Sequence, residues 1–93
     1  MKVKELLTGP EKWVKYVYAV DATGASVEPI DPRATAFCLR GAIRHCYPSP
    51  EQHKPIERMA YSSIQAFVCL VEWNDAPERT FADVRKLIEE LDI

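Results

Sequence analysis

Three cysteines and two histidines are the residues of this chain best suited to hold a metal ion or to carry redox chemistry. Cys38 and Cys46 lie eight positions apart, which is about 12 Å along a helix, so a single ion cannot join them there. Cys69 has no partner at Cys-x-x-Cys spacing, and His45 and His53 complete no ligand set. Because an odd number of cysteines in apolar surroundings is typical of a reducing compartment, we predict structural cysteines, with no metal ion and no cofactor.

Catalytic residues do not form a recognisable set in the sequence. The serine pair at 62–63 has no histidine or lysine at a telling spacing, so we do not predict a serine nucleophile. A small enzyme stays open as a minority alternative, and it rests only on the inventory of Cys38, His45, Asp75 and Arg79. We therefore assign no catalytic residue.

The segment that runs from Trp73 to Thr80 is the part of the chain most open to a functional interpretation. Asn74 and Asp75 favour turns because their side chains bond nearby backbone groups, and Arg79 lies close enough in sequence to pair with Asp75. A structural clasp explains these residues, and we favour it. The alternative is a loop that orients the carboxylate or phosphate of a ligand, although no base, nucleophile or metal ligand lies nearby.

Three arginines, Arg33, Arg40 and Arg44, are spaced so that they share one face of a helix. One interpretation is a stripe that contacts phosphates or an acidic partner. The other, which we favour, is the solvated face of a buried helix that pairs with acidic residues of 89–92, because three arginines without interleaved aromatic residues are a weak signal for nucleic-acid binding.

The elements that must position these residues are mostly helical. Residues 3–7 predict a short helix that ends at Gly9-Pro10, and residues 13–20 and 25–30 predict a β-hairpin. Asp31-Pro32 predicts the start of a buried central helix that runs to Cys46 or Tyr47. Within it, Gly41 would let another backbone or a large ring approach closely, and the candidate rings belong to Trp13 and Trp73.

Two further helices follow in the second half. Apolar residues recur at helical spacing from Ile56 to Val71, although residues 66–71 could instead be extended, and Ser49 with Gln52 could cap an earlier start. Thr80, with Asp83 three residues later, predicts the N-cap of a last amphipathic helix. The fold class is therefore mainly α: a small bundle of three to four helices with a short β-hairpin appendage near residues 13–30.

The length and the charge of the chain restrict its class. The 93 residues predict a single domain, 1–93, and a net charge of -2 argues against wholesale binding of nucleic acid through its phosphates. No segment reaches the roughly 18 apolar residues that a membrane span requires. We expect a cytoplasmic protein that does not bind membranes.

The motif Cys38-Leu39-Arg40-Gly41-Ala42, followed by Trp73-Asn74-Asp75 and then by Arg79-Thr80, resembles an uncharacterised domain-of-unknown-function family of small bacterial and phage proteins. In that family an early tryptophan, here Trp13, precedes the Cys-x-x-Gly-Ala element, and the late Trp-Asn-Asp turn leads into the last helix. The resemblance implies a compact, mainly helical fold and a bacterial or phage setting. It implies no activity.

Two classes of function remain. The favoured one is a non-catalytic protein-interaction or regulatory module, whose partner is an unknown protein or a second copy of the chain in a homodimer. The alternative is a nucleic-acid accessory factor that uses the Arg33, Arg40 and Arg44 face, and a small enzyme is the minority alternative. The expected interaction surface comprises Trp73, Asn74, Asp75, Arg79, Arg33, Arg40 and Arg44.

Overall fold

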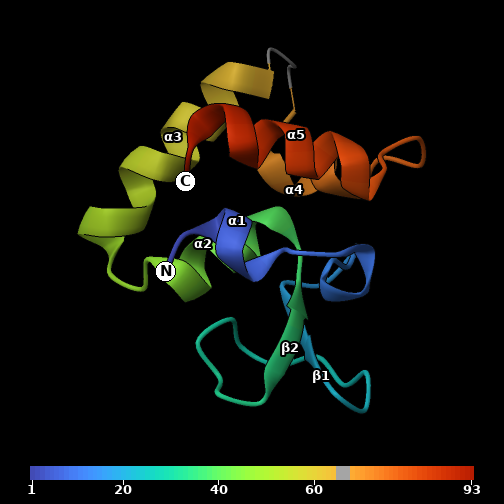
Figure 1. The fold of residues 1–93 in the computed structure, drawn as a ribbon. Coiled ribbons are helices and arrows are strands. Elements are labelled where there is room, and N and C mark those ends of the chain that lie inside the picture. Colours follow the sequence, from blue (N-terminus) through green and yellow to red (C-terminus); the bar gives the residue numbers. More distant parts are fainter. Residues whose placement is uncertain (65–67) are drawn as a thin grey trace.

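A computed structural model describes residues 1–64 and 68–93, and within them the chain is mainly helical (Figure 1). In chain order the elements are α1 (Val3–Leu6), a 3-10 turn η1 (Pro10–Lys12), β1 (Ala19–Asp21), β2 (Ala34–Phe37), α2 (Leu39–Cys46), α3 (Pro50–Ile64), α4 (Leu70–Asp75) and α5 (Phe81–Leu91). The two strands form one antiparallel pair. The predicted fold class, a small helical bundle with a β-hairpin appendage, is confirmed.

The helices pack in two layers, and the hairpin projects from one end (Figure 1). Helices α3, α4 and α5 lie on one side, and α1 and α2 lie against them. The fully buried side chains of Phe37, Leu39, Ile43, Val84 and Ile88 belong to the core between these elements. This core draws side chains from both halves of the sequence.

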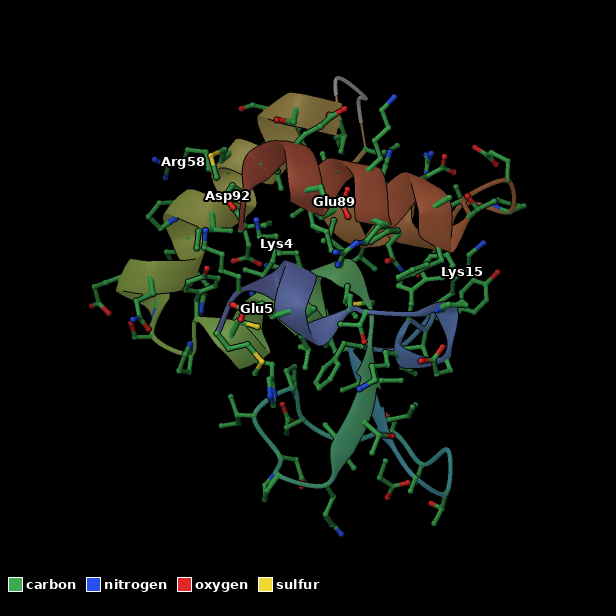
Figure 2. All side chains as sticks on the ribbon, in the orientation of Figure 1. Lys4, Glu5, Lys15, Arg58, Glu89 and Asp92 are labelled. Carbon is green, nitrogen blue, oxygen red and sulfur yellow. The ribbon has the colours of Figure 1, made fainter. Side chains whose placement is uncertain are left out.

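The two ends of the chain are fastened to each other. The backbone N–H of Lys4 donates to the carbonyl of Ile93 at 3.1 Å, and the Asp92 carboxylate accepts from the ammonium groups of Lys2 and Lys4. Figure 2 shows Lys4 and Asp92 facing each other between α1 and the end of α5. These ion pairs hold the pKa of the Asp92 carboxyl at about 2, below its ordinary 3.8. The short α1 is therefore held by tertiary contacts rather than by its own length.

The central helix begins later than the sequence predicts. Asp31 caps no helix: its carboxylate accepts from the backbone N–H of Arg33 at 2.8 Å and pairs with the Arg33 guanidinium. Residues 34–37 then form β2, in register with β1 so that Ala19 faces Phe37. The prediction of a helix from Asp31-Pro32 is wrong, because pairing with a distant strand outweighs the local start signal.

An antiparallel strand pair is present as predicted, but its second strand is not the one that the sequence predicted. The segment 25–30 contributes a single bridge, between Ser26 and Val20, and the partner of β1 is β2 instead. Asp21 closes the turn after β1, because its carboxylate accepts from the N–H groups of Thr23 and Ala25. The turn chemistry at residues 21–24 is therefore present, but the strand that returns lies farther along the chain.

The second half follows the sequence more closely. Helix α3 starts at Pro50 rather than at Ile56, with Ser49 bonded to the Gln52 side chain at 3.1 Å, and Pro55 lies inside it. Part of the segment 66–71 lies outside the described residues, and Leu70 begins α4. Thr80 and Asp83 form the predicted reciprocal cap of α5.

Candidate functional site

Asn74 is a fully buried polar residue whose hydrogen-bonding capacity is filled. Its Oδ1 accepts from the indole Nε1 of Trp13 at 2.6 Å and from the backbone N–H of Leu39 at 3.0 Å. Its Nδ2 donates to the carbonyl of Val14 at 3.1 Å and to Oδ1 of Asp75 at 3.0 Å. We call this group of five residues the Asn74 clasp. It joins the segment before β1, the first residue of α2 and the end of α4.

The neighbours of Asn74 make further contacts within the fold. Asp75 accepts from the backbone N–H of Tyr16 at 2.9 Å, which supports that residue in a left-handed conformation with φ of 74°. Arg79 donates to the carbonyl of Trp73 at 2.9 Å, and its guanidinium lies 4.1 Å from the centre of that indole ring. The predicted pair of Asp75 with Arg79 is not among the ion pairs of the described residues, in which Arg79 pairs with Asp83 at 3.8 Å.

The Cys-x-x-Gly element has a structural role as well. The Sγ of Cys38 accepts from the N–H of Gly41 at 3.3 Å and so caps α2. A Cβ atom added to Gly41 would make a steric clash with the carbonyl oxygen of Tyr18. The predicted close approach is therefore right for a backbone and wrong for the rings of Trp13 and Trp73. Burial raises the pKa of the Cys38 thiol, which makes it a poor nucleophile.

The residues of the enzyme alternative make separate structural contacts. Cys38 caps a helix, whereas His45 donates from Nδ1 to the carbonyl of Pro29 at 2.6 Å and packs against the ring of Phe37. Burial also raises the pKa of the Cys46 thiol, to about 11. Within residues 1–64 and 68–93, no three side chains of His, Cys, Asp or Glu gather in the way a metal site requires.

The three arginines do not form one line. Arg33 lies in the turn before β2, where it pairs with Asp31, because the helix that would have carried it starts only at Leu39. Arg40 and Arg44 remain on α2, but their partner is Glu57 of α3 and not the acidic residues of 89–92. The common face predicted for the three arginines is therefore wrong, and only two of them share a helix.

Glu57 is the acidic centre of this region, and its side chain is only 13% exposed. Its Oε1 accepts from Nε of Arg40 at 2.6 Å and lies 3.5 Å from Nε of Arg44. The Nε2 atom of His53 lies 4.0 Å from Oε2. Partial burial is the largest single influence on Arg40 and disfavours its charge, but the hydrogen bond and the negative charge of Glu57 together outweigh it and raise the pKa of the guanidinium. Glu57 thus ties α2 to α3 and compensates the Arg40 and Arg44 pair.

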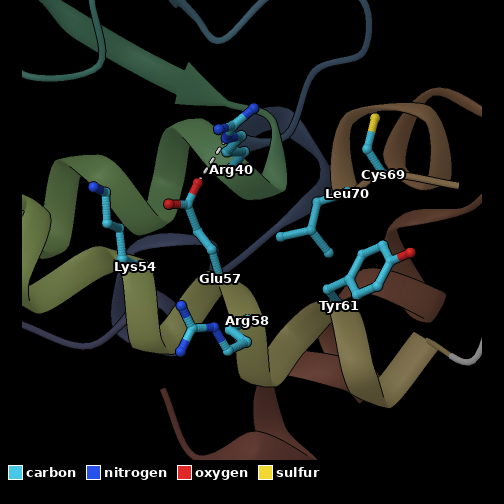
Figure 3. Close-up of a pocket in the computed structure, with 7 residues that line it drawn as sticks. All are labelled: Arg40, Lys54, Glu57, Arg58, Tyr61, Cys69 and Leu70. Carbon is cyan, nitrogen blue, oxygen red and sulfur yellow. Dashed lines mark hydrogen bonds and ion pairs between the residues drawn. The ribbon is translucent and has the colours of Figure 1, made fainter.

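A hollow of about 380 Å³ opens beside Glu57, and we call it the cationic hollow. It lies between α2, α3 and the start of α4 (Figure 3). Its lining consists of Arg40, Lys54, Glu57, Arg58, Tyr61, Cys69 and Leu70. Three cations and one carboxylate face it, so it favours an anionic ligand.

Lys54 and Arg58 are the cations of this hollow that the fold does not use. Both are exposed, and no salt bridge or side-chain hydrogen bond involves either of them in the described part of the chain. They also line a second hollow of about 390 Å³, together with Pro50, Glu51 and Pro55. The sequence shows them as two cations four positions apart on a helix, which is the signal that would have identified them.

Comparisons with known proteins agree with the family resemblance. A family model matches residues 2–91, and its description is a family of unknown function (DUF6197). No curated protein gives a significant match to this chain. No solved structure does so either. Among the described residues, none of the helices has the length and the apolar character to cross a membrane.

Proposed function

The chain belongs to a family of unknown function (DUF6197), and from the geometry of its surface we propose that it is a non-catalytic protein-interaction module. Its cationic hollow binds an acidic segment of a partner protein. The observation that carries this proposal is the Lys54 and Arg58 pair: two exposed cations on one face of α3, between two hollows, that form no ion pair among the described residues, although Glu51 shares the second hollow with them.

This choice of surface is supported by the difference between polar residues that are bonded within the fold and polar residues that are not. Trp73, Asn74, Asp75 and Arg79 are held in contacts that stabilise the fold. Arg40 and Arg44 are compensated by Glu57. A polar side chain that serves the fold is less free to change partners when a ligand arrives. Within the described part of the chain, Lys54 and Arg58 have no partner to give up.

The shape of the surface favours an extended ligand over a single ion. The two hollows adjoin along α3 because Lys54 and Arg58 line both of them. Tyr61 and Leu70 add apolar walls on one side, and Pro50 and Pro55 add them on the other. A peptide with acidic residues flanked by apolar ones would place its charges on the cations and its apolar side chains in the hollows.

The cellular setting is part of the same proposal. All three cysteines are free, with Cys38 buried and Cys69 exposed. Free thiols suit a reducing compartment, so we place the protein in the cytoplasm of a bacterium or of a cell infected by a phage.

The test is the binding of a fluorescein-labelled peptide of glutamate and tyrosine, followed by fluorescence anisotropy at low and at moderate salt. We expect the double variant Lys54→Gln with Arg58→Gln to weaken binding about tenfold, since two exposed ion pairs together supply about 1.4 kcal/mol. The matched control is Lys12→Gln with Lys86→Gln, which removes the same charge elsewhere and should bind as the wild type does.

Three outcomes would overturn the proposal. One is an equal loss in the control pair, which would show an unspecific effect of net charge. Another is the absence of binding at low salt. The third is preferential binding of a thymidine oligonucleotide over the peptide at equal salt, which would favour the nucleic-acid alternative.

A further inference from the structure

We infer that the acidic segment carries a phosphorylated side chain and that its phosphate binds between Lys54 and Arg58. This inference rests on the proposed function, and it names the anion that the cationic hollow takes.

Two pairs of cations on neighbouring helices differ in whether a carboxylate lies between their members. Arg40 and Arg44 lie four positions apart on α2, and the carboxylate of Glu57 lies between them, 2.6 Å and 3.5 Å from their Nε atoms. Lys54 and Arg58 lie four positions apart on α3 and have no such carboxylate among the described residues. Like charges at this spacing destabilise a helix, so the second pair gains from an anion supplied by a ligand.

The count of charges favours a dianion over a single carboxylate. The two hollows and the Glu57 pairing bring together four cations, Arg40, Arg44, Lys54 and Arg58, and two carboxylates, Glu51 and Glu57, so the cations exceed the carboxylates by two among the described residues. A carboxylate from a ligand would neutralise one of these charges. A phosphate monoester carries nearly two negative charges near neutral pH and has three acceptor oxygens. A single such group can therefore neutralise the charges of both Lys54 and Arg58.

The hollow contains enough hydrogen-bond donors for the three oxygens of a phosphate group. Arg58 can give two parallel N–H bonds to a phosphate, and Lys54 adds a charged ammonium donor. Arg40 bonds Glu57 through Nε, and its terminal nitrogens have no hydrogen-bond partner in the described residues. Figure 3 shows that Lys54 and Arg58 point to different sides of Glu57. Exposed side chains rotate within nanoseconds, so both can turn toward a shared anion.

Glu57 restricts where an anion can bind in the hollow. Its carboxylate is held by two arginines and is 13% exposed, so an anion close to it is repelled and is favoured next to Lys54 and Arg58 instead.

The experiment compares one peptide in two forms. The glutamate and tyrosine peptide is synthesised with a single tyrosine either free or phosphorylated, and both are titrated into the wild-type protein. We expect phosphorylation to increase the affinity at least about tenfold. We expect Lys54→Gln with Arg58→Gln to abolish that gain and Lys12→Gln with Lys86→Gln to preserve it. Circular dichroism of each variant checks that it is folded.

The outcomes separate this inference from the proposed function. If both peptides bind equally and both depend on Lys54 and Arg58, the phosphate inference is wrong and the interaction module stands. If neither peptide binds, both proposals fall. Inorganic phosphate is the third arm: if it competes with the phosphopeptide at an equal dissociation constant, the ligand is a free ion, and a phosphate borne by a partner protein is excluded.

Discussion

Replacing Asn74 by alanine is expected to be among the most damaging single changes in this fold. The variant removes one acceptor and one donor group that together make four hydrogen bonds. The N–H of Leu39 is buried and loses its partner, at a cost of about 2 kcal/mol. The Trp13 indole and the Val14 carbonyl are part-buried, at about 1 kcal/mol each. The sum is about 4 kcal/mol.

That loss is large for a chain of 93 residues. Domains of this kind unfold with roughly 5–15 kcal/mol, so Asn74→Ala removes a quarter or more of the stability. Because 1 kcal/mol shifts Tm by about 4–8 °C at this size, Tm should fall by at least about 15 °C. The free energy is measured by urea unfolding and Tm by thermal unfolding, each followed by circular dichroism and tryptophan fluorescence.

The matched control for this prediction is Glu72→Ala, an exposed change on the same helix, which should stay within about 0.5 kcal/mol of the wild type. Trp13→Phe removes one donor to Asn74 and should cost about 1–2 kcal/mol. Combined with Asn74→Ala it should add less than its own cost, because both changes break the same bond. If the free energy of unfolding of Asn74→Ala lay within about 1 kcal/mol of the wild-type value, the variant would be no worse than an ordinary surface change. That result would refute the view that the clasp joins the two halves of the chain.

Three further predictions follow from single contacts. Gly41→Ala should destabilise the protein in urea unfolding, although alanine is the better helix former, because its Cβ would collide with a backbone carbonyl; an unchanged midpoint would contradict this. Iodoacetamide should label exposed Cys69 well before Cys46, whose thiol pKa burial raises to about 11, as mass spectrometry of timed samples would show; equal rates would contradict it. Arg33→Gln should raise the pKa of the Asp31 carboxyl from about 2 toward 3.8 in an NMR titration. Since the folded pKa is depressed, the contribution of this pair to stability is complete above pH 3.8 and is lost as the pH falls toward 2, so an unchanged acid transition in the variant would count against it.

Local signals in the sequence identified the parts of the fold that depend on local contacts. The Thr80 cap and its reciprocal acid, three residues later, involve one turn of chain, and they are present as predicted. The start of α2 failed because Asp31-Pro32 is a good helix start in isolation, whereas residues 34–37 have a strand partner some fifteen residues earlier in the sequence. A propensity says nothing about such a partner.

The same distinction applies to the candidate site. Trp73, Asn74 and Asp75 were predicted as a turn but form the end of α4. The sequence predicted Arg79 as the partner of Asp75, whereas in the structure Asp75 bonds the backbone of Tyr16, far away along the chain. Glu57 was missed as the partner of Arg40 for the same reason, since its position on the facing helix depends on how α2 and α3 pack. The pair on α3 was visible in the sequence as like charges on one helix face.

The residues that carry the family resemblance converge on one structural unit. Trp13, Asn74 and the first turn of α2 meet in the Asn74 clasp, and Gly41 lets the chain before β1 lie against that turn. A motif that is accounted for by folding identifies the fold and leaves the activity undetermined. We therefore propose that the function lies in side chains that the clasp and the Glu57 pairing do not use. Lys54 and Arg58 meet that condition in the described residues, because their removal should leave the fold intact and change only what the surface binds.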